Sequence, residues 1–130
     1  MEYLCPHCNG HLKLEGCVVF SVKTSRGNRG LISLHSDIGN YSVKKHPDFH
    51  FKEGDRLHFF CPVCNAKLAS SIHDKLARII MIDDDNNEFE VLFSQVAGEK
   101  STFKIVGETM EIYGDDSAEY LDFVNLSMNF

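Results

Sequence analysis

The frame C-P-x-C-N-x-x-L occurs twice in the chain, as CPHCNGHL at residues 5–12 and as CPVCNAKL at residues 61–68. These stretches are named the first and second knuckles below. Two cysteines three positions apart in a tight turn place both sulfurs on one side of the backbone. The proline fixes φ near about −65°, and asparagine tolerates the left-handed conformation that the exit from such a turn often needs. Each knuckle therefore combines a rigid turn with two potential thiolate ligands.

Two such turns that face each other would form a tetrahedral site of four sulfurs, with Zn–S distances of about 2.3 Å. The sequence predicts that the ligands are Cys5, Cys8, Cys61 and Cys64. We expect one Zn²⁺ ion per chain, with iron as a less favoured occupant of the same geometry. Four cysteines fill the coordination shell, so the predicted site is structural and offers no position to water or substrate.

Two alternatives to a shared site remain open from the sequence. CPHC is also the active-site tetrapeptide of thioredoxin-like oxidoreductases, in which the first cysteine caps a helix that lowers its pKa. The glycines at positions 10 and 16 disfavour a long helix after Cys5, and a second C-P-x-C has no role in that chemistry. The other alternative is two separate metal sites, one at each knuckle.

The knuckles resemble those of the zinc-ribbon superfamily, and they are similar to a group of prokaryotic proteins described by two CpXC motifs. The resemblance covers the two eight-residue blocks, and it implies a metal site formed by the four knuckle cysteines. Ribbons serve in transcription, translation, protein assembly and enzyme scaffolds, so the resemblance implies no single function. Residues 9–60 separate the two cysteine pairs, whereas about 15–20 residues are usual. We expect a long insertion, and we expect it to carry the specificity.

Cys17 and the histidines are expected to play other parts. Cys17 opens the apolar run Cys17-Val18-Val19-Phe20, where a small buried side chain is the favoured interpretation and an alternative ligand or reactive thiol the other. His7, His11, His58 and His73 lie near the knuckle cysteines in sequence. Because four cysteines already complete the shell, none of these histidines is expected to bind the metal.

Most of the chain is predicted to be β. Short apolar or alternating runs are separated by polar and glycine-containing turns about every ten residues, which is typical of antiparallel β architecture. Leu68 to Ile80 also fits one face of a helix, but the β-branched residues favour a strand at 76–82. The predicted strands are 18–23, 31–35, 57–60, 76–82, 88–93, 102–106, 109–113 and 120–124.

We therefore predict a mainly β fold with zinc-ribbon-like paired knuckles. Residues 1–74 would form a zinc-ribbon-like region with a β insertion at 17–58. Residues 75–130 would form an acidic, antiparallel β-rich region, either as a second domain or as part of the same one.

Composition excludes several classes of protein. The 130 residues are 43% hydrophobic and 25% charged, which argues against a disordered chain or a fibre. No apolar run approaches the roughly 18–20 residues of a membrane helix, and no signal peptide is expected at the N-terminus. Thiolate ligands suit a reducing compartment. We expect a cytoplasmic protein that does not bind membranes.

Charge is distributed unevenly along the chain. Residues 1–75 hold ten Lys/Arg and seven Asp/Glu, a net of +3, whereas residues 76–130 hold three and twelve, a net of −9. Four thiolates with Zn²⁺ carry −2, which would reduce the first value to +1. The two halves either neutralise each other within one fold or meet different partners.

A basic and aromatic segment at residues 23–52 suggests nucleic-acid binding as an alternative function. Proteins that bind single strands combine cationic grooves with aromatic side chains on which bases stack. A pI of about 5.6 argues against it, since nucleic-acid-binding domains tend to be basic. The candidate contacts, for nucleic acid or another partner, are Lys23, Arg26, Arg29, Lys44, Lys45, Phe49, Phe51 and Lys52.

Calcium binding and catalysis are not favoured by the sequence. A calcium loop that began at Asp83 would need glycine at its sixth position and glutamate at its twelfth, but these are Glu88 and Ser94. No motif of a catalytic triad, a phosphate loop or a metalloprotease is present. The prediction is a non-enzymatic zinc protein that acts as a protein-interaction or regulatory module, with nucleic-acid binding as the alternative.

Overall fold

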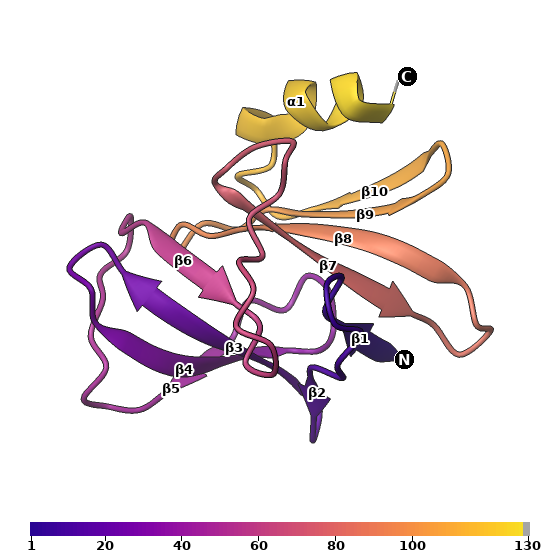
Figure 1. The fold of residues 1–130 in the computed structure, drawn as a ribbon. Coiled ribbons are helices and arrows are strands. Elements are labelled where there is room, and N and C mark those ends of the chain that lie inside the picture. The colour runs from indigo at the N-terminus through magenta and orange to yellow at the C-terminus, as the bar shows by residue number, and fades with distance from the viewer. Residues whose placement is uncertain (129–130) are drawn as a thin grey trace.

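In a computed structural model, residues 1–128 form a mainly β protein with ten strands and one helix in the described part of the chain. The strands form two antiparallel sheets (Figure 1). Sheet A has the order β1 (Glu2–Leu4), β7 (Leu76–Ile82), β8 (Glu88–Ser94), β9 (Thr102–Val106) and β10 (Thr109–Tyr113). Sheet B contains β2 (Lys13–Leu14), β3 (Cys17–Thr24), β4 (Arg29–His35), β5 (Val43–Lys45) and β6 (Leu57–Phe60).

Strand β3 organises sheet B. Residues 17–23 of β3 pair with β4 on one edge, and β4 pairs in turn with β5. On the other edge, β2 pairs with the start of β3 and β6 pairs with its last four residues. The side chains of β3 alternate, so that Val18, Phe20 and Val22 are buried while the residues between them are half-buried. One face of sheet B thus points into the core and the other faces outward.

The main core lies between the two sheets. Phe20 and Phe59 of sheet B meet Phe93 of sheet A in a cluster whose ring centroids are 5.2–5.3 Å apart. The same core contains Tyr3 of β1 and Met81 of β7. Residues on both sides of position 74 therefore share one hydrophobic core.

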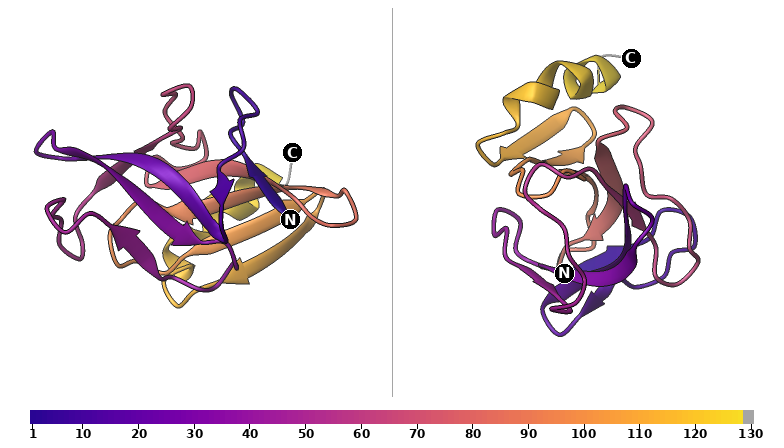
Figure 2. Two further views of the ribbon diagram at one scale, coloured as in Figure 1. Left: turned by 90° about the horizontal axis from the view of Figure 1, so that it is seen from below. Right: turned by 90° about the vertical axis from the view of Figure 1, so that its left-hand side faces the viewer.

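The middle of sheet A is buried on both faces. Val91, Leu92 and Phe93 follow one another along β8 and are all buried, although consecutive residues of a strand point to opposite faces. Val91 and Phe93 belong to the core between the sheets, whereas Leu92 belongs to a second core with Phe103. Helix α1 (Ala118–Met128) covers this second face, on the side away from sheet B (Figure 2).

The predicted strand at 120–124 is wrong, because this segment lies within α1. Tyr120 and Val124 are four residues apart and fully buried, and Leu121 and Met128 pack against the same core. This spacing places them on one face of a helix, which lies over the apolar outer face of sheet A.

The other predicted strands are confirmed. They correspond to β3, β4, β6, β7, β8, β9 and β10, and the helical alternative for residues 68–80 is wrong. The insertion 17–58 is β, as expected, and contains β3, β4, β5 and the first two residues of β6, all in sheet B. The short strands β1, β2 and β5 were not predicted.

Candidate metal centre

Each knuckle connects one sheet to the other. The first leads from β1 of sheet A to β2 of sheet B, and the second leads from β6 of sheet B to β7 of sheet A. In the left view of Figure 2 the two loops project side by side from the same part of the molecule. The chain therefore passes between the sheets twice at the same place.

The two knuckles have the same backbone structure. The amide of Asn9 donates to the carbonyl of Cys5 at 2.9 Å, and the amide of Cys5 donates to the carbonyl of Gly10 at 3.0 Å. Asn65, Cys61 and Ala66 repeat these bonds at 2.9 and 3.0 Å. Asn9 and Asn65 have φ values of 59° and 63°, so both exits use the left-handed conformation that the repeated asparagine predicts.

The four knuckle cysteines gather at one point. Cys5 Sγ lies 3.8 Å from Cys64 Sγ, and Cys8 Sγ lies 3.8 Å from Cys61 Sγ. All four sulfurs lie within 4.8 Å of one another. A regular tetrahedron with metal–sulfur distances of about 2.3 Å has sulfur–sulfur edges of about 3.8 Å. The cluster could therefore bind one metal ion with cysteine ligands from both knuckles.

Backbone amides point at the sulfurs. The amide of His7 donates to Cys5 Sγ at 3.4 Å, and that of Gly10 donates to Cys8 Sγ at 3.3 Å. In the second knuckle the amides of Val63 and Cys64 donate to Cys61 Sγ at 3.3 and 3.4 Å. Such donors stabilise the thiolate form of cysteine, which is the form that binds metals.

The two knuckles contribute one buried and one exposed cysteine each. Cys5 and Cys61 are buried in the main core, whereas Cys8 and Cys64 are exposed. Burial raises the pKa of the Cys5 thiol to about 12. Burial is the largest single effect on Cys61 and acts to raise its pKa, but hydrogen bonds from the amides of Cys64 and Val63 and with the side chains of Cys5 and Cys64 together outweigh it, so this pKa is lowered. A metal ion that binds here must displace the proton from Cys5.

A close contact between the knuckles explains one glycine. A Cβ at Gly10 would lie 3.1 Å from Cys8 Sγ and 3.3 Å from a methyl group of Val63. Gly10 therefore lets the second knuckle approach the first. The spacing of the cysteines does not predict this contact. The one sequence signal for it is that the sixth position of the first knuckle is glycine, whereas the second knuckle has alanine there.

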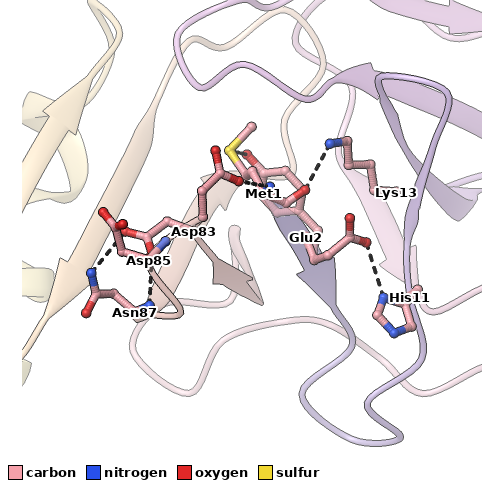
Figure 3. Close-up of polar contacts among 9 residues, drawn as sticks. Met1, Glu2, His11, Lys13, Asp83, Asp85 and Asn87 are labelled. Carbon is pink, nitrogen blue, oxygen red and sulfur yellow. Dashed lines mark hydrogen bonds and ion pairs between the residues drawn. The ribbon is translucent and has the colours of Figure 1, made fainter.

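The histidines near the knuckles make other contacts. His7 Nε2 lies 3.1 Å from the carbonyl oxygen of Lys67, and His11 Nδ1 lies 3.2 Å from Glu2 Oε1 (Figure 3). Cys17 is half-buried on β3. Within residues 1–128, the group of potential ligands that the structure brings together consists of the four knuckle cysteines alone.

The structure also decides between the alternatives for the cysteines. The residues after Cys5 form a turn, and no helix begins there, so the arrangement of a thioredoxin-like active site is not formed. Two separate sites are excluded because the four sulfurs form one cluster.

The acidic run after β7 is a hairpin loop. Asp83 Oδ1 accepts hydrogen bonds from the amides of Asp85 and Asn87 at 3.0 and 2.8 Å (Figure 3). These bonds lower the pKa of Asp83, with the Asn87 amide as the largest cause. Its carboxylate thus closes the turn between β7 and β8.

The structure does not bring the basic and aromatic residues predicted to contact a partner together in one site. Lys23 and Arg29 are cross-strand neighbours on the outward face of sheet B, beside His58. Phe49 is buried, with its ring directly over Gly30. Phe51 is half-buried, and its ring centroid lies 5.7 Å from that of Phe49. Lys45 Nζ donates to the carbonyl of Phe49 at 2.6 Å. The side chains of Arg26, Lys44 and Lys52 are exposed.

No family model, curated protein or solved structure matches this chain. Within residues 1–128, the one helix is too short to cross a membrane. The candidate centre therefore rests on its own geometry, in which four thiol groups from two knuckles meet at the spacing of a tetrahedral metal site.

Proposed function

We propose that this protein is a zinc protein with a structural Zn(Cys)₄ centre of the zinc-ribbon type, and that it acts as a non-enzymatic interaction module in the cytoplasm. One observation carries the metal assignment. The Sγ–Sγ distances of 3.8 Å between the knuckles match the edge of a tetrahedron around Zn²⁺ (about 3.8 Å) and exceed an S–S bond of about 2.05 Å.

The position of the centre supports a structural role. The ion would join the two places where the chain passes between sheets A and B. It would also join residues far apart in sequence, because Cys5 Sγ meets Cys64 Sγ. The ion would bind the folded chain, in which the four sulfurs lie together, and hardly bind the unfolded chain, so its binding free energy would stabilise the fold. Four protein ligands exclude substrate from the ion, so catalysis at the metal is not part of the proposal.

The surface around the centre supports an interaction role. Leu14 of β2 and Val63 of the second knuckle are large apolar side chains with 67% and 65% of their surface exposed. Leu31 on β4 is 59% exposed. Val63 belongs to the second knuckle, and Leu14 and Leu31 belong to strands of sheet B. We propose that a protein partner contacts this region.

The metal assignment predicts a specific spectrum. Protein purified without chelator should contain one zinc per chain, and X-ray absorption should show four sulfurs at about 2.3 Å. Replacement of zinc by Co²⁺ should give the intense visible bands of tetrahedral cobalt with strong thiolate-to-metal charge transfer. A first shell with a nitrogen ligand, or folded protein that takes up no metal, would contradict the assignment.

Nucleic-acid binding is the second candidate, and the outward face of sheet B favours it. Lys23 pairs with Arg29 on one side and with His58 on the other, so three basic side chains lie in a row across three strands. The guanidinium of Arg29 lies 5.0 Å from the ring centroid of Phe60. Burial lowers the pKa of His58 most, and the neighbouring cations Arg56, Lys67 and Lys23 lower it further, in that order. The positive charge of this row therefore comes from Lys23 and Arg29, although the whole chain is acidic.

For this candidate, a fluorescent single-stranded oligonucleotide should bind with an affinity that falls steeply with salt. Lys23→Glu with Arg29→Glu should weaken binding and reduce the slope of log K against log [salt] by about 1.4, or about 0.7 for each lost phosphate contact. Lys75→Glu with Lys100→Glu makes the same charge change away from sheet B and should leave binding nearly unchanged. Equal losses in the two variants, or no salt-dependent binding by the native protein, would reject this candidate.

A further inference from the structure

A cavity of about 300 Å³ lies between sheets A and B. Its walls are apolar. Sheet B contributes Val18, Phe20 and Ile32, and sheet A contributes Ile79, Val91 and Phe93. Protein interiors are close-packed, and voids larger than a water molecule are few. This cavity reaches side chains of the main core and opens at the surface, so it is a candidate ligand site.

The mouth of the cavity is polar and is formed by two loops. Residues 35–41 follow β4, and residues 95–102 connect β8 to β9. Tyr41 joins the loops, since its hydroxyl lies 2.9 Å from Thr102 Oγ1. The fixed charges that line the cavity are three carboxylates and one ammonium group, from Asp37, Glu53, Glu99 and Lys100. The mouth therefore carries a net negative charge.

We propose that this cavity binds an apolar small molecule about the size of two fused aromatic rings, either uncharged or with one cationic end at the mouth. The volume sets the size. A dry cavity of about 150 Å³ takes up one benzene molecule, and about 300 Å³ is at the lower end of the range for ligand pockets. The charge of the mouth sets the preference, because an anionic group would meet three carboxylates and a single lysine.

This site is separate from the proposed metal centre and from the proposed partner surface. The four knuckle cysteines do not line the cavity, so a ligand can bind while the metal remains bound. Tyr3 connects the two regions. It lines the cavity, lies two residues before Cys5, and donates a hydrogen bond of 2.6 Å to the carbonyl of Ser36 at the mouth. Tyr3 is thus in position to respond to both sites.

Three matched probes test the proposal on the zinc-loaded full chain: 2-naphthylmethanol, 2-naphthylmethylamine and 2-naphthoate. By calorimetric titration, the neutral and cationic probes should bind, and the anionic probe should bind at least tenfold more weakly. NMR spectra should show intermolecular contacts from the bound probe to the methyl groups of Val18, Ile79 and Val91. Contacts to Leu14 and Val63 instead, or no binding of any probe, would overturn the proposal. Equal binding of the anionic probe would overturn its charge preference.

Two variants test the location of the site. Val91→Phe places a ring in the cavity and should weaken probe binding at least tenfold. Val19→Phe makes the same change on the outward face of β3 and should leave binding unchanged. Retained binding by Val91→Phe with its zinc content intact would show that the probe binds elsewhere. Should Val91→Phe fail to fold, the contacts measured on the native protein decide the location.

The mouth is tested by removal of its charge. Asp37→Asn with Glu53→Gln neutralises two of the three carboxylates that line the cavity. The preference for the cationic over the anionic probe should fall at least threefold. An unchanged preference would show that the carboxylates do not determine which ligand binds.

Discussion

Cys61→Ser should remove the zinc and cost the protein a large part of its stability, whereas Cys17→Ser should change neither. Cys61 is a buried member of the cysteine cluster, only 1% exposed, and it lies in the main core. A serine there would lose the metal bond and leave the ion with three ligands. Structural zinc contributes about 10–16 kcal/mol in zinc-finger peptides at pH 7, and a typical domain is stable by only about 5–15 kcal/mol. We expect Cys61→Ser to lose several kcal/mol, because the core between the sheets supplies part of the stability without the metal.

Zinc content after gel filtration and urea unfolding of both variants measure this effect. Cys17→Ser is a matched control, since it makes the same chemical change at a half-buried position outside the cluster. Treatment of the native protein with a strong chelator should lower its unfolding midpoint to a value near that of Cys61→Ser. If Cys61→Ser keeps stoichiometric zinc and an unchanged midpoint, the four cysteines do not form the site.

The cysteine cluster could be predicted because the geometry of each knuckle is local and the same motif occurs twice in the sequence. Each knuckle sets its own turn through the proline, the asparagine and the cysteine spacing, and the two copies have the same hydrogen bonds. That the copies meet was inferred from the chemistry of zinc and not from the fold. In the structure the two knuckles meet because β1 of sheet A and β6 of sheet B lead into them at the same place.

Other parts of the fold depend on contacts that no local pattern encodes. The strands β1, β2 and β5 have two or three residues each, too few for an alternating pattern to be visible. The segment at 120–124 is short and apolar, so its residues fit a strand as well as a helix. The second apolar face of sheet A decides in favour of the helix, and that face exists only after the strands have paired.

The cavity was beyond prediction from the sequence for the same reason. Its walls come from alternate residues of strands in both sheets, and their sequence pattern is the ordinary pattern of a core. For Phe49 and Phe51 the sequence pattern allows two interpretations, and it does not decide between them. Their alternation with polar residues is compatible with either exposed stacking platforms or core packing, and Phe49 proves to be buried. The predicted division into 1–74 and 75–130 stays a prediction, although β1 pairs with β7 across it.

Gly114→Ala should destabilise the protein by about 3 kcal/mol, because the native glycine is required for two independent reasons. Its φ of +92° lies in a region that costs other residues about 1–2 kcal/mol. A Cβ at this position would also overlap the carbonyl group of Lys100 and the hydroxyl of Tyr41. Insertion of atoms into a well-packed site typically costs about 1–3 kcal/mol more. Tyr41 also bonds to Thr102 at 2.9 Å, so its displacement would disturb the mouth of the cavity.

Gly27→Ala isolates the second reason from the first. Gly27 has nearly the same φ, +90°, but nothing lies within 4 Å of a Cβ built on it. It should therefore lose only about 1–2 kcal/mol in urea unfolding, and the difference between the variants measures the close approach of residue 114 to Lys100. Two hydrogen bonds hold Lys100 close to the segment after Gly114. The Asp116 amide donates to the Lys100 carbonyl at 2.9 Å, and the Lys100 amide donates to Asp116 Oδ2 at 2.8 Å. This junction joins β10 and the start of α1 to the loop before β9. Equal losses of stability in the two variants would mean that residue 114 does not approach Lys100 as closely as the structure has it. The mouth of the cavity would then be wider than described.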